Sequence, residues 1–179
     1  MQKNISLRLS HVLLFALVIL FCFAVVWMAL QFQLFQNWNN KDHQLAAHAA
    51  EEGAMAFYAI DYRENPDIWI NRLCEVSTTD GCNIANTFYR NFLWPSFVDD
   101  GVRTTVNILS SESVLVEDSQ QIWRVRIRPG ETWVGLPLPE TGSKDVFISI
   151  MQDSDENWKL HRILSDEEVT TLLNEVVNE

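Results

Sequence analysis

The side chains that most often perform catalysis are sparse in this chain and are poorly spaced for it. Four histidines occur, at positions 11, 43, 48 and 161. His43 and His48 are five residues apart, whereas a helix brings two side chains to one face at a spacing of three or four. No GxSxG, P-loop, GxGxxG or HExxH motif is present. The sequence therefore predicts no catalytic residue, no metal site and no cofactor.

Asp61 and His161 are the residues on which an enzymatic alternative would depend. Asp61 follows Tyr58 in a helical pattern, so both can line a pocket, and Tyr62 and Arg63 come directly after it. His161 falls on the polar face of an expected strand, which favours a solvated histidine over a catalytic base. An enzyme is thus the third hypothesis, after an assembly protein and a ligand-binding protein.

Cys74 and Cys82 bracket the stretch CEVSTTDGC. They lack CxxC spacing and a nearby histidine, which a zinc site would need. In an oxidising compartment such a pair forms a disulfide, and closing a ring of nine residues stabilises the fold by about 2.5 kcal/mol in a chain-entropy treatment. Two free thiols are the alternative, and we predict the disulfide.

The apolar run at residues 12–30 contains nineteen residues without a charge. As a helix it would be about 28 Å long, close to the thickness of a bilayer core. A buried core helix and a cleaved signal peptide are the alternatives, but the run exceeds the usual signal-peptide length and no A-x-A-like site follows it. We predict a cytoplasmic stub (residues 1–10), a transmembrane helix (11–35) and a linker (36–42). Lys3 and Arg8 place the N-terminus in the cytoplasm.

The segment after residue 40 is strongly acidic. It holds eleven Lys and Arg against twenty-four Asp and Glu, a formal charge of −13. Such a segment repels nucleic-acid phosphates, so we do not expect direct nucleic-acid binding. Its length suffices for one domain with its own core, which we place at residues 43–179 outside the cytoplasm.

Helices precede strands in this expected α+β domain. Small and apolar residues at helical spacing predict a long helix at 42–62, packed closely against a sheet. Asn65-Pro66 begins a second helix at 67–73, and a third at 83–93 ends at Trp94-Pro95. Strands are expected at 102–109, 114–116, 121–128, 146–151 and 158–163, with a long loop at 129–142. A capping box at Ser165–Glu168 begins a final helix.

The strand at 121–128 alternates between two faces. Trp123, Val125 and Ile127 fall on one face, and a row of three arginines, at 124, 126 and 128, falls on the other. Such a row can bind a ligand. In an acidic protein, pairing with neighbouring carboxylates is favoured.

The succession of elements resembles the nuclear transport factor 2-like cone, in which three helices pack on a curved antiparallel sheet. AFYAIDY (56–62), QIWRVRI (121–127) and WKLHRIL (158–164) carry the resemblance. With one span and a C-terminal helix, the chain resembles the bitopic scaffold proteins of type IV secretion and conjugation machines, including the TcpC type. It differs in having room for one cone rather than two. The Cys74–Cys82 loop has no place in the family pattern.

This resemblance implies a scaffold in the cytoplasmic (inner) membrane that contacts other membrane-complex subunits or further copies of itself, without catalysis. The alternative is a membrane-tethered cone that holds a lipid or other small apolar ligand. Phe97, Trp133 and Leu136 are the candidate partner-contact residues. Each can instead close the core.

Overall fold

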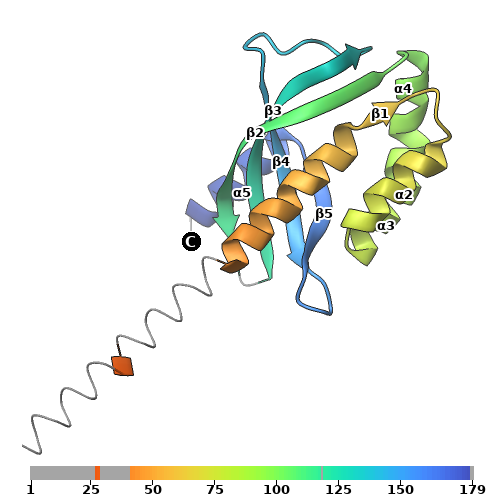
Figure 1. Cartoon of the computed structure of the whole chain (residues 1–179). Helices are drawn as coiled ribbons and strands as arrows, with labels where there is room; N and C mark the ends of the chain where they lie inside the picture. Colours follow the sequence, from red (N-terminus) through yellow and green to blue (C-terminus); the bar gives the residue numbers. More distant parts are fainter. Residues whose placement is uncertain (1–26, 29–40, 118, 178–179) are drawn as a thin grey trace, which may run out of the picture. The chain divides into compact units, whose positions relative to one another are not determined.

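The computed structural model describes residues 27–28, 41–117 and 119–177 (Figure 1). The predicted stub (1–10) lies outside these residues, as do all but Trp27 and Met28 of the predicted transmembrane helix (11–35) and most of the linker (36–42). Within the described part, no helix is both long and apolar enough to cross a membrane. The chain divides into two compact units, Met1–His43 and Gln44–Glu179.

The second unit is an α+β domain built on one antiparallel sheet. Its strands are β1 (Ile60–Asp61), β2 (Arg103–Val116), β3 (Gln120–Val134), β4 (Lys144–Gln152) and β5 (Trp158–Leu164), hydrogen-bonded in sequence order. Its helices are most of the long helix (residues 41–58, of which 44–58 belong to this unit), α2 (Pro66–Val76), α3 (Thr79–Ile84), the π-helical segment η1 (Ala85–Leu93), α4 (Trp94–Asp99) and α5 (Asp166–Val177). Figure 1 shows the sheet curving between the long helix on one face and α5 on the other.

Alternation along β3 explains why the sheet is covered on both faces. Trp123, Val125 and Ile127 are buried in the larger core, with the long helix, whereas Ile122 belongs to a smaller core with Val169 of α5. The predicted inward face of this strand is confirmed. Two of the three outward arginines meet carboxylates, as favoured from the sequence: Arg124 pairs with Glu112, and Arg126 donates to both oxygens of Asp145 at 2.7 and 2.9 Å.

Small residues let the long helix approach the sheet closely, as its composition predicts. The helix buries five alanines and Gly53, where an added Cβ would lie 3.1 Å from Leu160 Cδ1. The predicted extension to residue 62 is wrong. The helix ends at Tyr58 because Ile60 and Asp61 pair with Thr104 and Arg103 as strand β1.

The third helix does not stop at Trp94-Pro95. The chain stays helical from Thr79 to Asp99, with η1 between α3 and α4. The N–H of Trp94 donates to Tyr89 O, five residues back, so the turn before Pro95 is wide. A π turn gives room for a proline ring that would clash in a regular α-helix, which is why this proline ends no helix.

The predicted loop at 129–142 is shorter than expected, because β3 continues through Pro129-Gly130 to Val134. Val106 pairs with Pro129, and a register shift follows before Thr104 meets Trp133. A Cβ on Gly130 would lie 2.9 Å from Thr105 O, so the glycine permits this approach of β2 to β3. The predicted strands at 102–109 and 114–116 are likewise one strand, β2, with irregular register.

The remaining predicted elements are present. Asn65 accepts a hydrogen bond from Asp67 N at 2.9 Å and caps α2. The hairpin of β4 and β5 closes through the acidic turn. Ser165 and Glu168 form the reciprocal capping box of α5, with the Ser165 N–H donating to Glu168 Oε2 at 2.8 Å.

Candidate functional site

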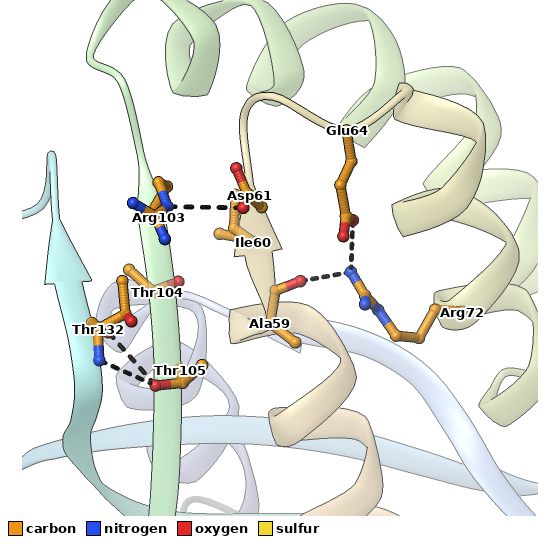
Figure 2. A pocket seen from close by; sticks show the side chains of 9 residues that line it. All are labelled: Ala59, Ile60, Asp61, Glu64, Arg72, Arg103, Thr104, Thr105 and Thr132. Atoms are coloured by element: carbon orange, nitrogen blue, oxygen red, sulfur yellow. Dashed lines mark hydrogen bonds and ion pairs between the residues drawn. The ribbon is translucent and has the colours of Figure 1, made fainter.

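A small pocket with four charged side chains in its lining lies where the long helix ends and β1 begins. Its volume is about 210 Å³. Figure 2 shows Arg103 of β2 on one side, Arg72 of α2 on the other, and β1 between them. The remaining lining residues are Ala59, Ile60, Asp61, Glu64 and three threonines, Thr104, Thr105 and Thr132. The pocket thus lies between the β1 edge of the sheet and helix α2.

Asp61 is held as a fixed anion in this pocket. Arg63 Nε donates to Asp61 Oδ1 at 2.8 Å, the Arg63 Nη2 contacts Oδ2, and the Arg63 backbone N–H donates to Oδ1 at 3.1 Å. Arg103 Nε lies 3.5 Å from Oδ2. The hydrogen bond from Arg63 is the main reason that the pKa of Asp61 lies far below its ordinary range. A carboxylate of such low basicity is a poor general base, so the geometry favours a positioning role for Asp61.

Arg72 is held by the backbone as well as by an acid. Its Nη2 donates to Ala59 O at 2.6 Å and lies 3.6 Å from Glu64 Oε2. The second distance is too long for a hydrogen bond, and Glu64 Oε2 is buried without another partner in the described residues. Figure 2 shows Arg72 reaching across from α2 toward the end of the long helix. This pocket is therefore arranged for binding through fixed charges rather than for proton transfer.

The helical segment η1 carries a second candidate feature, an exposed aromatic pair. Phe88 is 51% exposed and Phe92 is 64% exposed, and their ring centroids are 5.3 Å apart. Tyr89 between them points inward, contacts Phe57 and Trp69, and accepts a hydrogen bond from Ile163 N at 3.3 Å. Burial raises the pKa of Tyr89. The pair therefore stands on a segment that is anchored in the core.

The predicted partner-contact residues occupy a different position. Phe97, Trp133 and Leu136 are partly buried and pack against the larger core. Phe97 meets Trp69 at 5.6 Å, and Trp133 stacks on Tyr58 at 6.4 Å. These contacts favour the alternative that the three residues close the core.

Cys74 and Cys82 form a disulfide, as the sequence predicts, which links α2 to α3. Asn86 Nδ2 donates to Cys82 O at 3.0 Å, so the linkage continues into η1. The disulfide-linked region, α2 and α3, packs on the outer edge of β5, where Thr78 N donates to Leu160 O at 2.8 Å. This part of the chain is thereby fixed to the sheet.

His161 lies in β5 beside α3 rather than in open solvent. Its imidazole is partly buried, and Nδ1 has no hydrogen-bond partner in the described residues. Burial is the largest cause lowering its pKa, Arg162 lowers it further, and Asp80 opposes the shift. Asp61 and His161 are placed on β1 and β5, the two outer strands of the sheet.

The sequence did not predict that Arg72 and Arg103 lie on opposite sides of one pocket. The only local signal was the charged run after Tyr58, which contains Asp61, Arg63 and Glu64. No protein-family model, curated protein or solved structure matches this chain. Functional arguments for it depend on the chemistry of its own residues.

Proposed function

We propose that this protein is a single-pass scaffold subunit of a type IV secretion or conjugative DNA-transfer complex. In this proposal residues 11–35 anchor it in the cytoplasmic membrane, with the N-terminus in the cytoplasm. Its α+β domain then acts outside, through contacts with other subunits or with further copies of itself. The resemblance of the chain to bitopic scaffold proteins supports this assignment, as does the apolar run before the domain.

The observation that carries the proposal is the exposed aromatic pair on η1. Two phenylalanines exposed by more than half lie next to each other on this segment, and aromatic residues are enriched in protein–protein contacts. Tyr89 and the Cys74–Cys82 disulfide hold the segment that presents them. A preorganised surface loses less conformational entropy on binding. This suits a subunit whose task is assembly.

The experiment is site-specific photo-crosslinking in intact membranes. A photoreactive residue at position 92 should crosslink to another subunit of the purified membrane complex. The same residue at position 109 is the matched control, because Leu109 is also exposed, at 45%, but lies on β2. Recovery of only free, uncrosslinked monomer from position 92 would refute the proposal.

A double substitution, Phe88→Ser and Phe92→Ser, is compared with the wild type for stability and for incorporation into the complex. Because both rings are exposed, we expect the unfolding midpoint to change little while incorporation into the complex falls at least tenfold. If incorporation is unchanged in this variant, the aromatic pair is not the contact surface.

The apolar-ligand hypothesis stays a prediction without an observation that favours it. The pocket beside β1 is lined by four charged side chains, a chemistry that suits a polar ligand. Native mass spectrometry of the purified protein tests the hypothesis, because a bound lipid would travel with the chain.

A further inference from the structure

The charged groups around the pocket beside β1 do not balance. The lining holds two guanidinium groups, on Arg72 and Arg103, and the two carboxylates of Asp61 and Glu64, and Arg63, which lies outside the lining, pairs with Asp61. Arg63 satisfies Asp61 through its Nε and Nη2, and Arg72 is the cation next to Glu64. One positive charge, on Arg103, remains in excess. Such an excess is notable in a protein of net charge −11.

Arg103 also has unused hydrogen-bond donors. It approaches Asp61 through Nε alone, at 3.5 Å, and within the described residues its two terminal amino groups have no protein acceptor. Its side chain is 38% exposed and lines the pocket, while its Nε is buried without a hydrogen-bond partner in the described residues. Figure 2 shows the Arg103 guanidinium group on β2, next to Asp61 of β1. A guanidinium fork with free terminal N–H groups matches the two oxygens of a carboxylate.

The size of the pocket restricts what it can hold. About 210 Å³ is less than the roughly 300–1,000 Å³ of sites for drug-sized ligands, so a small group rather than a whole cofactor fits. The lining has hydroxyl groups on three threonines and no aromatic ring. A compact polar group is favoured, and the single excess charge favours a monoanion.

We infer that this pocket binds a carboxylate, with Arg103 as the main ligand-binding residue and Arg72 on the opposite side. The ligand is either a small free carboxylic acid or the acidic side chain of a bound protein. In both cases the chemistry is the same: a bidentate contact to Arg103 that neutralises the excess charge. Asp61 positions Arg103 and is not itself a ligand contact. This inference does not depend on the proposed scaffold function.

The test is a titration of the full-length protein in detergent. Binding is monitored through the Nε–Hε NMR signals of its arginines. The probes are sodium acetate, the peptide N-acetyl-Gly-Glu-Gly-amide and its Gln counterpart, each against sodium chloride at equal ionic strength. We expect acetate and the Glu peptide to shift the Arg103 signal saturably, and chloride and the Gln peptide to leave it in place. Peptide binding at least tenfold tighter than acetate binding would identify the acidic side chain as the source, and equal binding would identify the free acid.

Variants separate the site from general electrostatics. Arg103→Gln should weaken carboxylate binding at least tenfold, and Arg103→Lys should restore part of it because the charge returns without the fork. Arg126→Gln is the matched control, because Arg126 is already held by Asp145 outside the pocket and its loss should change nothing. Shifts that chloride reproduces, or binding that survives Arg103→Gln, would overturn the inference.

Discussion

At the scale of single residues, Gly81 sets how closely α3 approaches the sheet. A Cβ at this position would lie 2.7 Å from the carbonyl oxygens of both Leu160 and His161. Both oxygens belong to the backbone of β5, so neither can rotate away. The residue type is thus dictated by a contact that is distant in sequence, and the stretch TTDGC gives no sign of it.

Two opposing effects make Gly81→Ala informative. Helix propensity alone predicts stabilisation by about 1 kcal/mol, because alanine is the better helix former. The clash predicts destabilisation by about 1–3 kcal/mol, because the helix or the strand must move. We expect the clash to prevail, so urea unfolding should show a lower free energy of unfolding. Asn83→Ala, an exposed position in the same helix, should stay within about 0.5 kcal/mol of the wild type.

Glu168 makes the capping box of α5 sensitive to acid. The backbone N–H of Ser165 donates to its carboxylate and is the main cause lowering the pKa of Glu168. A folded-state pKa below the unfolded value means that the stabilisation is complete above the ordinary glutamate pKa and is lost as pH falls through the folded value. We therefore expect the urea midpoint to decrease below about pH 4.5.

The matched variant is Glu168→Gln, because glutamine preserves the capping box without a titrating group. Its urea midpoint should depend less on pH between 5 and 3 than that of the wild type. Some dependence should remain, because hydrogen bonds to Asp145 and Asp153 lower the pKa of these carboxyls too. Identical pH profiles for the two proteins would show that the cap contributes nothing to acid sensitivity.

At the scale of elements, sequence patterns predicted what depends on local chemistry. Alternation along residues 121–128 gave the buried face of β3, and the Asn65-Pro66 and Ser165–Glu168 signals gave two helix starts. Sequence patterns failed where the surrounding structure, rather than the local residue type, determines the conformation. Pro129 reads as a strand end, yet β2 pairs with it, and Pro95 reads as a helix end, yet the π turn accommodates it. The pocket was missed for the same reason, since Arg72 and Arg103 come to line one pocket only in the folded domain.

The disulfide-linked helical region covers the outer edge of β5. Thr78 N donates to Leu160 O, and Ile163 N donates to Tyr89 Oη at 3.3 Å. An exposed strand edge is a template for unwanted pairing, so this cover protects the sheet. The disulfide between Cys74 and Cys82 ties together the two helices at the centre of the cover.

Removing that bond in a Cys74→Ser, Cys82→Ser variant should loosen the cover before it unfolds the sheet. We expect a loss of about 2.5 kcal/mol in the free energy of unfolding. Amide hydrogen exchange should accelerate at Thr78 and Ile163 while Val125, buried in the centre of the sheet, stays protected in proportion to global stability. Equal acceleration at all three amides would mean that the cover has no independent stability.

At the scale of the whole molecule, the order of elements was sufficient to predict the α+β class. Helices that precede a run of antiparallel strands have few ways to cover both sheet faces, and the long helix and α5 cover them here (Figure 1). Shape alone does not determine a partner, because one architecture supports many functions. The proposed assembly therefore has to be tested in membranes, and the proposed anchor at residues 11–35 is the first part to test.

The anchor has two consequences that one experiment on spheroplasts can separate. If residues 11–35 span the membrane with the N-terminus inside, added protease should digest the α+β domain in intact spheroplasts and leave a short membrane-bound fragment. Thiol alkylation before reduction should then leave Cys74 and Cys82 unlabelled, because an oxidising compartment preserves their disulfide. A domain that resists protease until the cells are lysed, together with labelled cysteines, would place it in the cytoplasm. The cytoplasmic thiol pool would then keep the pair reduced, and the cover on β5 would have to hold without its covalent link.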